Sequence, residues 1–72
     1  MPARRDRTST GEDPRFYDAL GRAIQVARTE QGLSRKELAR RAGISYAYLS
    51  DIETGRGRPS SAALIGVAQA LG

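Results

Sequence analysis

This 72-residue sequence contains no cysteine and no histidine, and each absence excludes a class of chemistry. Without cysteine the chain can form neither disulfides nor thiolate metal sites. Without histidine it has neither the commonest general base nor the commonest metal ligand. No apolar run approaches the roughly 18 residues that a membrane span needs, and no apolar segment follows the first arginines as it would in a secretory signal. We therefore expect no enzyme, no metal or other cofactor, and no membrane partner.

The chain is long enough for one small domain. Most of its positively charged residues are arginines, and they are unevenly distributed along the sequence. Eleven of the twelve cationic residues are Arg, and the formal net charge is +4. A GC-rich genome would also produce this arginine bias, so the position of the charge is more informative than its amount. The segment 34–58 contains six cations and three carboxylates, and its net charge of +3 is most of the excess. Such a concentration is typical of a surface that faces phosphate.

Helix caps and apolar spacing divide the chain into a polar arm and four predicted helices. Residues 1–13 are polar and lack apolar periodicity, so we expect a flexible N-terminal arm. The predicted helices cover about 14–31, 35–42, 46–54 and 61–71. Asp13-Pro14 is a typical helix start, and Gly32 is expected to cap the end of the first helix. Ser34 and Glu37 form a capping box, in which each side chain would accept the other residue's free amide. No segment alternates with a period of two, so we expect no strand.

Apolar residues recur at helical spacing and predict the faces that form the core. The predicted inward residues are Phe16, Leu20, Ile24 and Ala27 in the first helix, Leu38, Ala39 and Ala42 in the second, Leu49 and Ile52 in the third, and Leu64, Ile65, Ala68 and Leu71 in the last. Gly43 is expected to take a positive φ and Ile44 to fill the corner after it. The predicted fold is all-α, a compact bundle of four or five short helices. Residues 35–54 would form a helix-turn-helix, a pair of helices whose shape fits the DNA major groove.

Several short motifs occur in the order that characterises a known family. They are Gln31-Gly32-Leu33-Ser34, Leu38-Ala39, Ala42-Gly43-Ile44-Ser45, Tyr48-Leu49-Ser50, Ile52-Glu53-Thr54-Gly55, Pro59-Ser60 and Ala68-Gln69-Ala70-Leu71-Gly72. In this arrangement the chain resembles the Xre family, the phage repressor and Cro-like helix-turn-helix domains of bacterial transcriptional regulators. The resemblance extends from Leu20 to the end and implies a lambda-repressor-like fold. It also implies that a fifth helix could follow Gly72, as family members usually have one there.

The resemblance implies a role for individual residues. The helix 46–54 would be the recognition helix, and the implied base-reading residues are Tyr46, Ala47, Ser50 and Asp51. The implied phosphate contacts are Arg35, Ser45, Tyr48, Thr54, Arg56 and Arg58. For Arg35, which opens the second helix, the resemblance also allows a second role, the support of a neighbouring base-reading residue. Arg28 and Glu53 would form a structural salt bridge. The chemistry of the two loop arginines independently agrees, since both flank the flexible Gly57 and could reach backbone oxygens.

Other interpretations stay open for many of these residues. Tyr46 and Tyr48 are also compatible with ordinary surface aromatics, and Ser45 is a helix cap before it is a phosphate contact. Asp51 would repel phosphate unless it accepts a hydrogen bond from a cytosine amino group. Arg40 and Arg41 fit a solvated helix face better than a DNA contact. The arginines of the arm, Arg4, Arg5 and Arg7, are either part of a disordered tail or contacts in the minor groove.

The sequence thus favours a sequence-specific regulator of transcription that binds double-stranded DNA, with a homodimer on a near-palindromic site as its expected form. We expect such a protein in the cytoplasm, associated with the nucleoid when bound to DNA. Two alternatives share the fold. One is an antitoxin that binds its own operator and a toxin protein, and the other is a protein-interaction module without a DNA role. Whether a toxin or an effector is a partner does not follow from the sequence.

Overall fold

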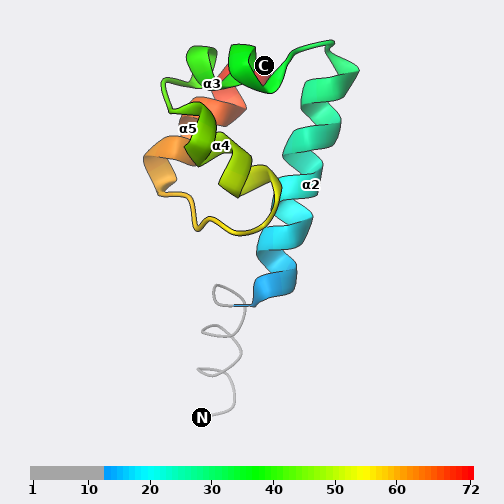
Figure 1. Ribbon diagram of the computed structural model, residues 1–72, viewed down its shortest axis with the longest axis vertical. Coiled ribbons are helices and arrows are strands. Elements are labelled where there is room, and N and C mark those ends of the chain that lie inside the picture. The colour runs from blue at the N-terminus through cyan, green and yellow to red at the C-terminus, as the bar shows by residue number, and fades with distance from the viewer. Residues whose placement is uncertain (1–12) are drawn as a thin grey trace.

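The computed structural model describes residues 13–72, which form four helices (Figure 1). The helices are α2 (Pro14–Glu30), α3 (Arg35–Ala42), α4 (Tyr46–Glu53) and α5 (Ser61–Leu71). Within these residues there is no strand, and the predicted all-α bundle is confirmed. The predicted N-terminal arm, with Arg4, Arg5 and Arg7, lies outside the described residues except for Asp13.

Each helix begins at a side chain that accepts a hydrogen bond from a free backbone amide. Asp13 accepts from the amide of Arg15 at 2.9 Å. Ser34, Ser45 and Ser60 each accept from the amide three residues further on, at 3.0, 3.0 and 3.1 Å. A cap of this kind stabilises a helix by about 1 kcal/mol, which matters most for α3 and α4 because each has only eight residues.

One detail of the predicted helix ends is wrong. The capping box is only half formed, because the Glu37 carboxylate accepts hydrogen bonds from Arg40 and Arg41 on its own helix instead of turning back to Ser34. Guanidinium groups are stronger donors to a carboxylate than a neutral amide is. Gly32 ends the first helix as predicted. Glu30 is the last helical residue, Gln31 follows it, and Gly32 takes the left-handed conformation with φ of 72°, while the amides of Gly32 and Leu33 donate back to the carbonyl oxygens of Thr29 and Arg28.

The long helix α2 stands on one side of the molecule, and the three shorter helices pack together on the other (Figure 1). Helix α3 packs on α4 and α5, while α2 packs mainly on α4. The residues of the buried cluster are Ile24, Leu38, Ala39, Leu49, Ile52 and Val67. Phe16, predicted to face the core, is exposed because the first turns of α2 extend past the other helices (Figure 1).

Helix α2 and helix α4 approach each other most closely at Gly21. A Cβ atom on this glycine would lie 2.7 Å from the carbonyl oxygen of Glu53 and closer still to that of Ile52. Real Cβ atoms essentially never come this near to backbone oxygens, so only glycine fits. This contact sets the distance between α2 and the helix that was predicted to read DNA.

The buried face of α5 differs from the predicted one. Ala63 and Val67 are buried, whereas Ile65 is 56% exposed and Ala68 is exposed. The side of α5 that faces α3 has small residues because these two helices are close together. A Cβ at Gly66 of α5 would lie 2.7 Å from the carbonyl oxygen of Ala42 of α3. This close approach, rather than apolar periodicity, selects the inward side.

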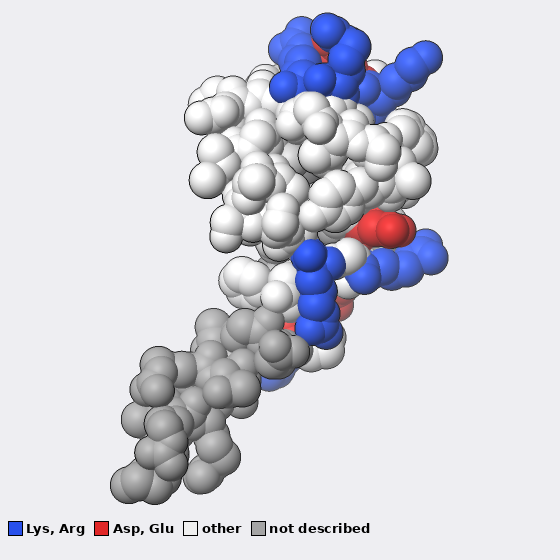
Figure 2. All heavy atoms as spheres, turned by 90° about the vertical axis from the view of Figure 1, so that its left-hand side faces the viewer, with Lys and Arg blue, Asp and Glu red and all other residues white. Residues whose placement is uncertain are grey.

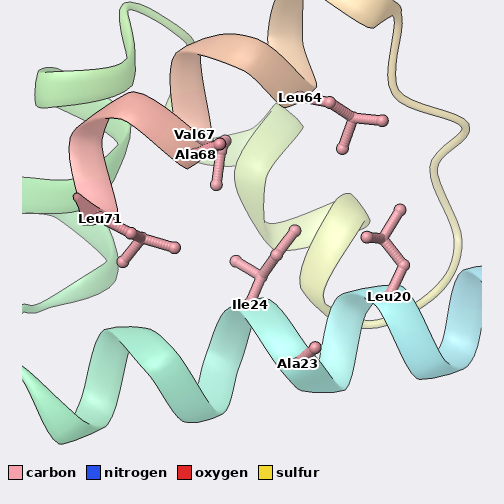
Figure 3. Close-up of a pocket in the computed structure, with 7 residues that line it drawn as sticks. All are labelled: Leu20, Ala23, Ile24, Leu64, Val67, Ala68 and Leu71. Atoms are coloured by element: carbon pink, nitrogen blue, oxygen red, sulfur yellow. The ribbon is translucent and has the colours of Figure 1, made fainter.

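One side of α5 faces α2 across an apolar pocket of about 330 Å³ (Figure 3). From α5 the pocket is lined by Leu64, Val67, Ala68 and Leu71, and from α2 by Leu20, Ala23 and Ile24. Leu64 and Leu71 are only half-buried, so these predicted core residues form a shallow apolar groove instead of the centre of the core.

Candidate nucleic-acid interface

The turn between α3 and α4 has the geometry of a tight helix-turn-helix. Gly43 has φ of 75°, and the amide of Ile44 donates to the carbonyl oxygen of Ala39 at 3.0 Å. A positive φ is accessible to glycine without strain, so the chain can turn here within three residues. After this turn, the first residues of α4, Tyr46 and Ala47, are exposed to solvent.

One side of α4 faces solvent and contains all four predicted base-reading residues. Leu49, Ile52 and Glu53 are buried, and they fix the inward side of the helix. Tyr46 is 54% exposed, Ala47 and Asp51 are exposed, and Ser50 is half-buried. Because residues four apart share a helix face, Tyr46 and Ser50 are neighbours on the surface.

Positive charge lies on either side of a broad uncharged surface. Figure 2 shows the Lys and Arg side chains in two groups, one at the end of the molecule formed by α3 and one at the level of the loop between α4 and α5. The loop arginines, Arg56 and Arg58, are exposed. The amides of Arg56 and Gly57 both donate to the carbonyl oxygen of Asp51, at 2.9 and 3.0 Å, so the loop is anchored to the end of α4.

The charge at the α3 end is partly neutralised by one carboxylate. Hydrogen bonds from Arg40 and then Arg41 lower the pKa of the Glu37 carboxyl to about 2, and the same contact raises the pKa of the Arg40 guanidinium. Glu37 therefore stays charged at any physiological pH. This leaves Lys36 and one net arginine charge as the positive excess of the exposed α3 surface.

A buried carboxylate joins α2, α3 and α4. Glu53 accepts from Arg28 at 2.8 and 3.1 Å and from Arg35 at 3.0 Å. The predicted structural salt bridge is thus present in the structure and has a third member. Arg35 also donates to the hydroxyl of Ser50 at 3.3 Å. The guanidinium of Arg35 is directed toward α4, and not outward as a free surface arginine would be.

Three of the predicted phosphate contacts have their hydroxyl oxygens in internal hydrogen bonds. Ser45 caps α4 by accepting from the amide of Tyr48. The hydroxyl of Tyr48 accepts from the amide of Ser60 at 3.1 Å and so connects α4 to the start of α5. Thr54 donates to the carbonyl oxygen of Ser50 at 2.9 Å. The first two hydroxyls keep a hydrogen that can be donated outward, whereas that of Thr54 is directed into its own helix.

Arg58 stacks on an aromatic ring of α2. Its guanidinium carbon lies 5.1 Å from the centre of the Tyr17 ring, which is within the range of a cation–π contact. Tyr17 in turn meets Phe16 edge to face at 5.1 Å. The first turns of α2, which extend beyond the other helices, therefore provide support for an arginine of the α4–α5 loop.

A comparison with protein families decides what kind of domain this is. The family model described as helix-turn-helix matches residues 24–72, which is more than half of the chain. The chain belongs to the Xre-type helix-turn-helix family. The resemblance seen in the sequence motifs is thereby confirmed.

Relatives of this helix-turn-helix domain are regulators and repressors by name. The chain is 47% identical over 53 residues to the uncharacterized HTH-type transcriptional regulator y4dJ of Sinorhizobium fredii, a match of 74% of the chain and 69% of the relative. It is 43% identical over 53 residues to the immunity repressor protein of Bacillus phage phi105, covering 74% of the chain but 37% of the relative. The chain thus spans little more than a third of the length of that repressor.

A solved structure shares the fold of this helix-turn-helix domain. It is that of the clp gene regulator ClgR from Corynebacterium glutamicum, with 40% sequence identity and a TM-score of 0.73. The match covers 76% of this chain and 58% of the ClgR chain.

Two contacts of the helix-turn-helix domain were missed by sequence reasoning. The Arg35–Ser50 hydrogen bond joins residues 15 apart, and the Arg58–Tyr17 contact joins the loop to the far end of α2. Within residues 13–72 no group of three or more metal-ligating side chains is present, and no helix there is long and apolar enough to cross a membrane.

If Arg58 contacts phosphate, its aromatic support should affect DNA binding. Replacing Tyr17 with leucine should weaken DNA affinity about two- to fivefold, because a cation–π contact of this kind holds the guanidinium in place. Tyr17→Phe keeps the ring and should weaken binding less than Tyr17→Leu does. Fluorescence anisotropy with a labelled duplex measures both. Equal affinity of the leucine and phenylalanine variants would show that the ring has no part in placing Arg58.

Proposed function

We propose that this domain binds double-stranded DNA sequence-specifically as the DNA-binding part of a transcriptional regulator, with α4 in the major groove. The observation that carries the proposal is the exposed side of α4, which is followed directly by the exposed arginines Arg56 and Arg58, in a fold of the helix-turn-helix family. Phosphates border the groove on both sides, and base edges line its floor. The names of the relatives, regulators and repressors, support the same function.

The exposed arginines would supply affinity for DNA, and the exposed side of α4 would supply sequence specificity. Arg56 and Arg58 would bind phosphate and supply affinity without sequence preference. Tyr46 and Ala47 would contact base edges, where the alanine methyl and the tyrosine ring suit a thymine methyl group. Asp51 is exposed on the same side and would need a cytosine amino group as its donor.

Hydroxyl chemistry separates the remaining phosphate candidates. Ser45 and Tyr48 accept their internal hydrogen bonds, so each can still donate its hydrogen to a phosphate oxygen. Thr54 donates internally through both its hydroxyl and its amide, and phosphate offers no hydrogen in return. We therefore retain Ser45 and Tyr48 as contacts to the DNA phosphate backbone. Thr54 is not retained as a phosphate contact, because its hydrogen bonds serve to end α4. A homodimer would place two such helices about 34 Å apart on a near-palindromic site.

Two substitutions test this division of labour on a duplex obtained by selection from random DNA. Arg56→Ala should weaken binding to every sequence alike and reduce the slope of log affinity against log salt by about 1. Tyr46→Ala should change which bases are preferred at one position of the site. Both are measured by fluorescence anisotropy at several salt concentrations.

The matched control is Arg22→Ala, which removes an exposed arginine from α2. It should leave the base preference unchanged and weaken binding less than Arg56→Ala does. If the natural domain binds no DNA even at low salt, or binds with no salt dependence, the proposed function is wrong. If Arg56→Ala and Tyr46→Ala both alter base preference, only the division of labour is wrong.

A further inference from the structure

We propose that Arg35 and Ser50 form one specificity-determining pair that reads the acceptor edge of a guanine, and that buried Glu53 is the residue that positions them. The inference rests on the proposed DNA-binding function. Of the two roles that the sequence left open for Arg35, it excludes the phosphate contact and makes the residue a base reader itself. It depends on charge, burial and hydrogen-bond direction in the group formed by Arg28, Glu53, Arg35 and Ser50.

The first step is the excess of positive charge around Glu53. Its side chain is 0% exposed and binds two guanidinium groups, so one carboxylate faces two cations. Arg28 is the inner partner, with 11% of its side chain exposed, and it also donates to the carbonyl oxygen of Leu33 at 2.9 Å. Arg35 is the outer partner, with 24% of its side chain exposed. The uncompensated positive charge is therefore accessible to a ligand at Arg35.

The second step is the direction of the hydrogen bond to Ser50. The Nη1 group of Arg35 donates to the Oγ atom of Ser50, so the hydroxyl hydrogen of Ser50 must point elsewhere. Ser50 lies one helical turn after Tyr46 on the outward side of α4. The Nη2 group of Arg35 has no hydrogen-bond partner among residues 13–72. The Ser50 hydroxyl and the Arg35 Nη2 group can therefore each donate a hydrogen bond, next to a positive charge.

The third step is the pattern that each base presents in the major groove. Guanine presents two acceptors, O6 and N7, while adenine presents one acceptor and one donor. Cytosine presents a donor, and thymine presents one acceptor beside a methyl group. A pair of donors with a positive charge therefore matches guanine better than any other base.

The fourth step is the difference in mobility between Arg35 and the loop arginines. Glu53 fixes Arg35 through its Nε atom, and Ser50 contacts it from α4, so little side-chain freedom is left to lose on binding. Arg56 is exposed on a loop and can follow a phosphate as DNA shape varies. A held guanidinium beside the exposed side of α4 suits a base at a fixed position.

The test compares the base preferences of the natural domain, Ser50→Ala and Arg35→Lys, each selected against the same pool of random duplexes. Lysine keeps the charge but loses the planar fork of donors. We expect both variants to relax the same guanine, with discrimination against the other bases falling about tenfold. In the natural domain, 7-deazaguanine at that position should weaken binding because it removes N7. The same change should have little further effect on either variant.

The outcomes separate this inference from the proposed function. Circular dichroism establishes that each variant is folded, and Ser50→Ala alone tests the pair if Arg35→Lys is not. A guanine preference that neither variant changes would overturn the inference, and so would Arg35→Lys weakening all sequences alike with an altered salt slope. If the natural domain enriches no sequence, the proposed function fails and the inference fails with it.

Discussion

Replacement of Gly21 by alanine should destabilise the domain by about 3 kcal/mol. In most helices this change is stabilising by about 1 kcal/mol, because alanine restricts the unfolded chain and favours the helix. Here the new Cβ would lie 2.7 Å from the carbonyl oxygen of Glu53, and α2 would have to move away from α4. Since a chain of this size has a total stability of about 4–11 kcal/mol, the loss would be a large share of it.

Urea unfolding followed by circular dichroism measures this effect. Arg22→Ala is the matched control, because it is an exposed position next to Gly21 on the same helix and should change the unfolding midpoint little. A midpoint for Gly21→Ala equal to or above that of the natural domain would contradict the close approach of the two helices.

Replacement of Glu53 by glutamine should cost about 3 kcal/mol or more. The substitution preserves the shape of the side chain but leaves two guanidinium groups without an anion, and that of Arg28 is buried. It also places an amide donor against arginine donors. The loss arises from charges left unpaired in the interior, not from the intrinsic strength of the ion pair.

Glu37→Gln is the matched control for this prediction. Glu37 also accepts from two arginines, Arg40 and Arg41, but on the surface of α3, where water screens the interaction. It should therefore change the urea midpoint only slightly. If the two glutamine variants lose the same stability, burial is not what makes the Glu53 contacts important.

The helices were predictable because their ends are determined locally. Ser34, Ser45 and Ser60 each cap through an amide three residues away, and Gly43 takes the positive φ that lets the chain turn within three residues. These signals are contained in a few consecutive residues, so the sequence is enough to find them. The partner of Glu37 was not predictable in the same way, because two arginines on its own helix compete with the backbone for its carboxylate.

The inward face of α5 could not be predicted from apolar spacing. Apolar residues occur on nearly every side of this helix, so periodicity gives no unique answer. The face is decided by the close approach of α3, which accommodates Ala63 and Gly66 but no larger residue at the latter. The sequence of one helix does not determine which of its sides a second helix will approach.

The candidate site was predictable to the extent that it lies on one helix. Tyr46, Ala47 and Asp51 are exposed on α4 as their spacing from the buried Leu49 and Ile52 requires. The contacts of Arg35 and Arg58 depend on how α3, α4 and the start of α2 are placed in space. No spacing in the sequence signals them, and both concern the arginines on which the proposed DNA contacts depend.

The eight-residue lengths of α3 and α4 have a consequence for folding and exchange. Helices shorter than about 12 residues do not persist alone in water, so these two exist only while they are packed on α2 and α5. The amide hydrogens of α4 that are hydrogen-bonded within the helix, those of Leu49 and the residues after it, should then exchange with solvent when the whole domain opens. The exposed face of α4 and the domain therefore share a single opening equilibrium, and any substitution that loosens the core also lowers the fraction of molecules that present this face.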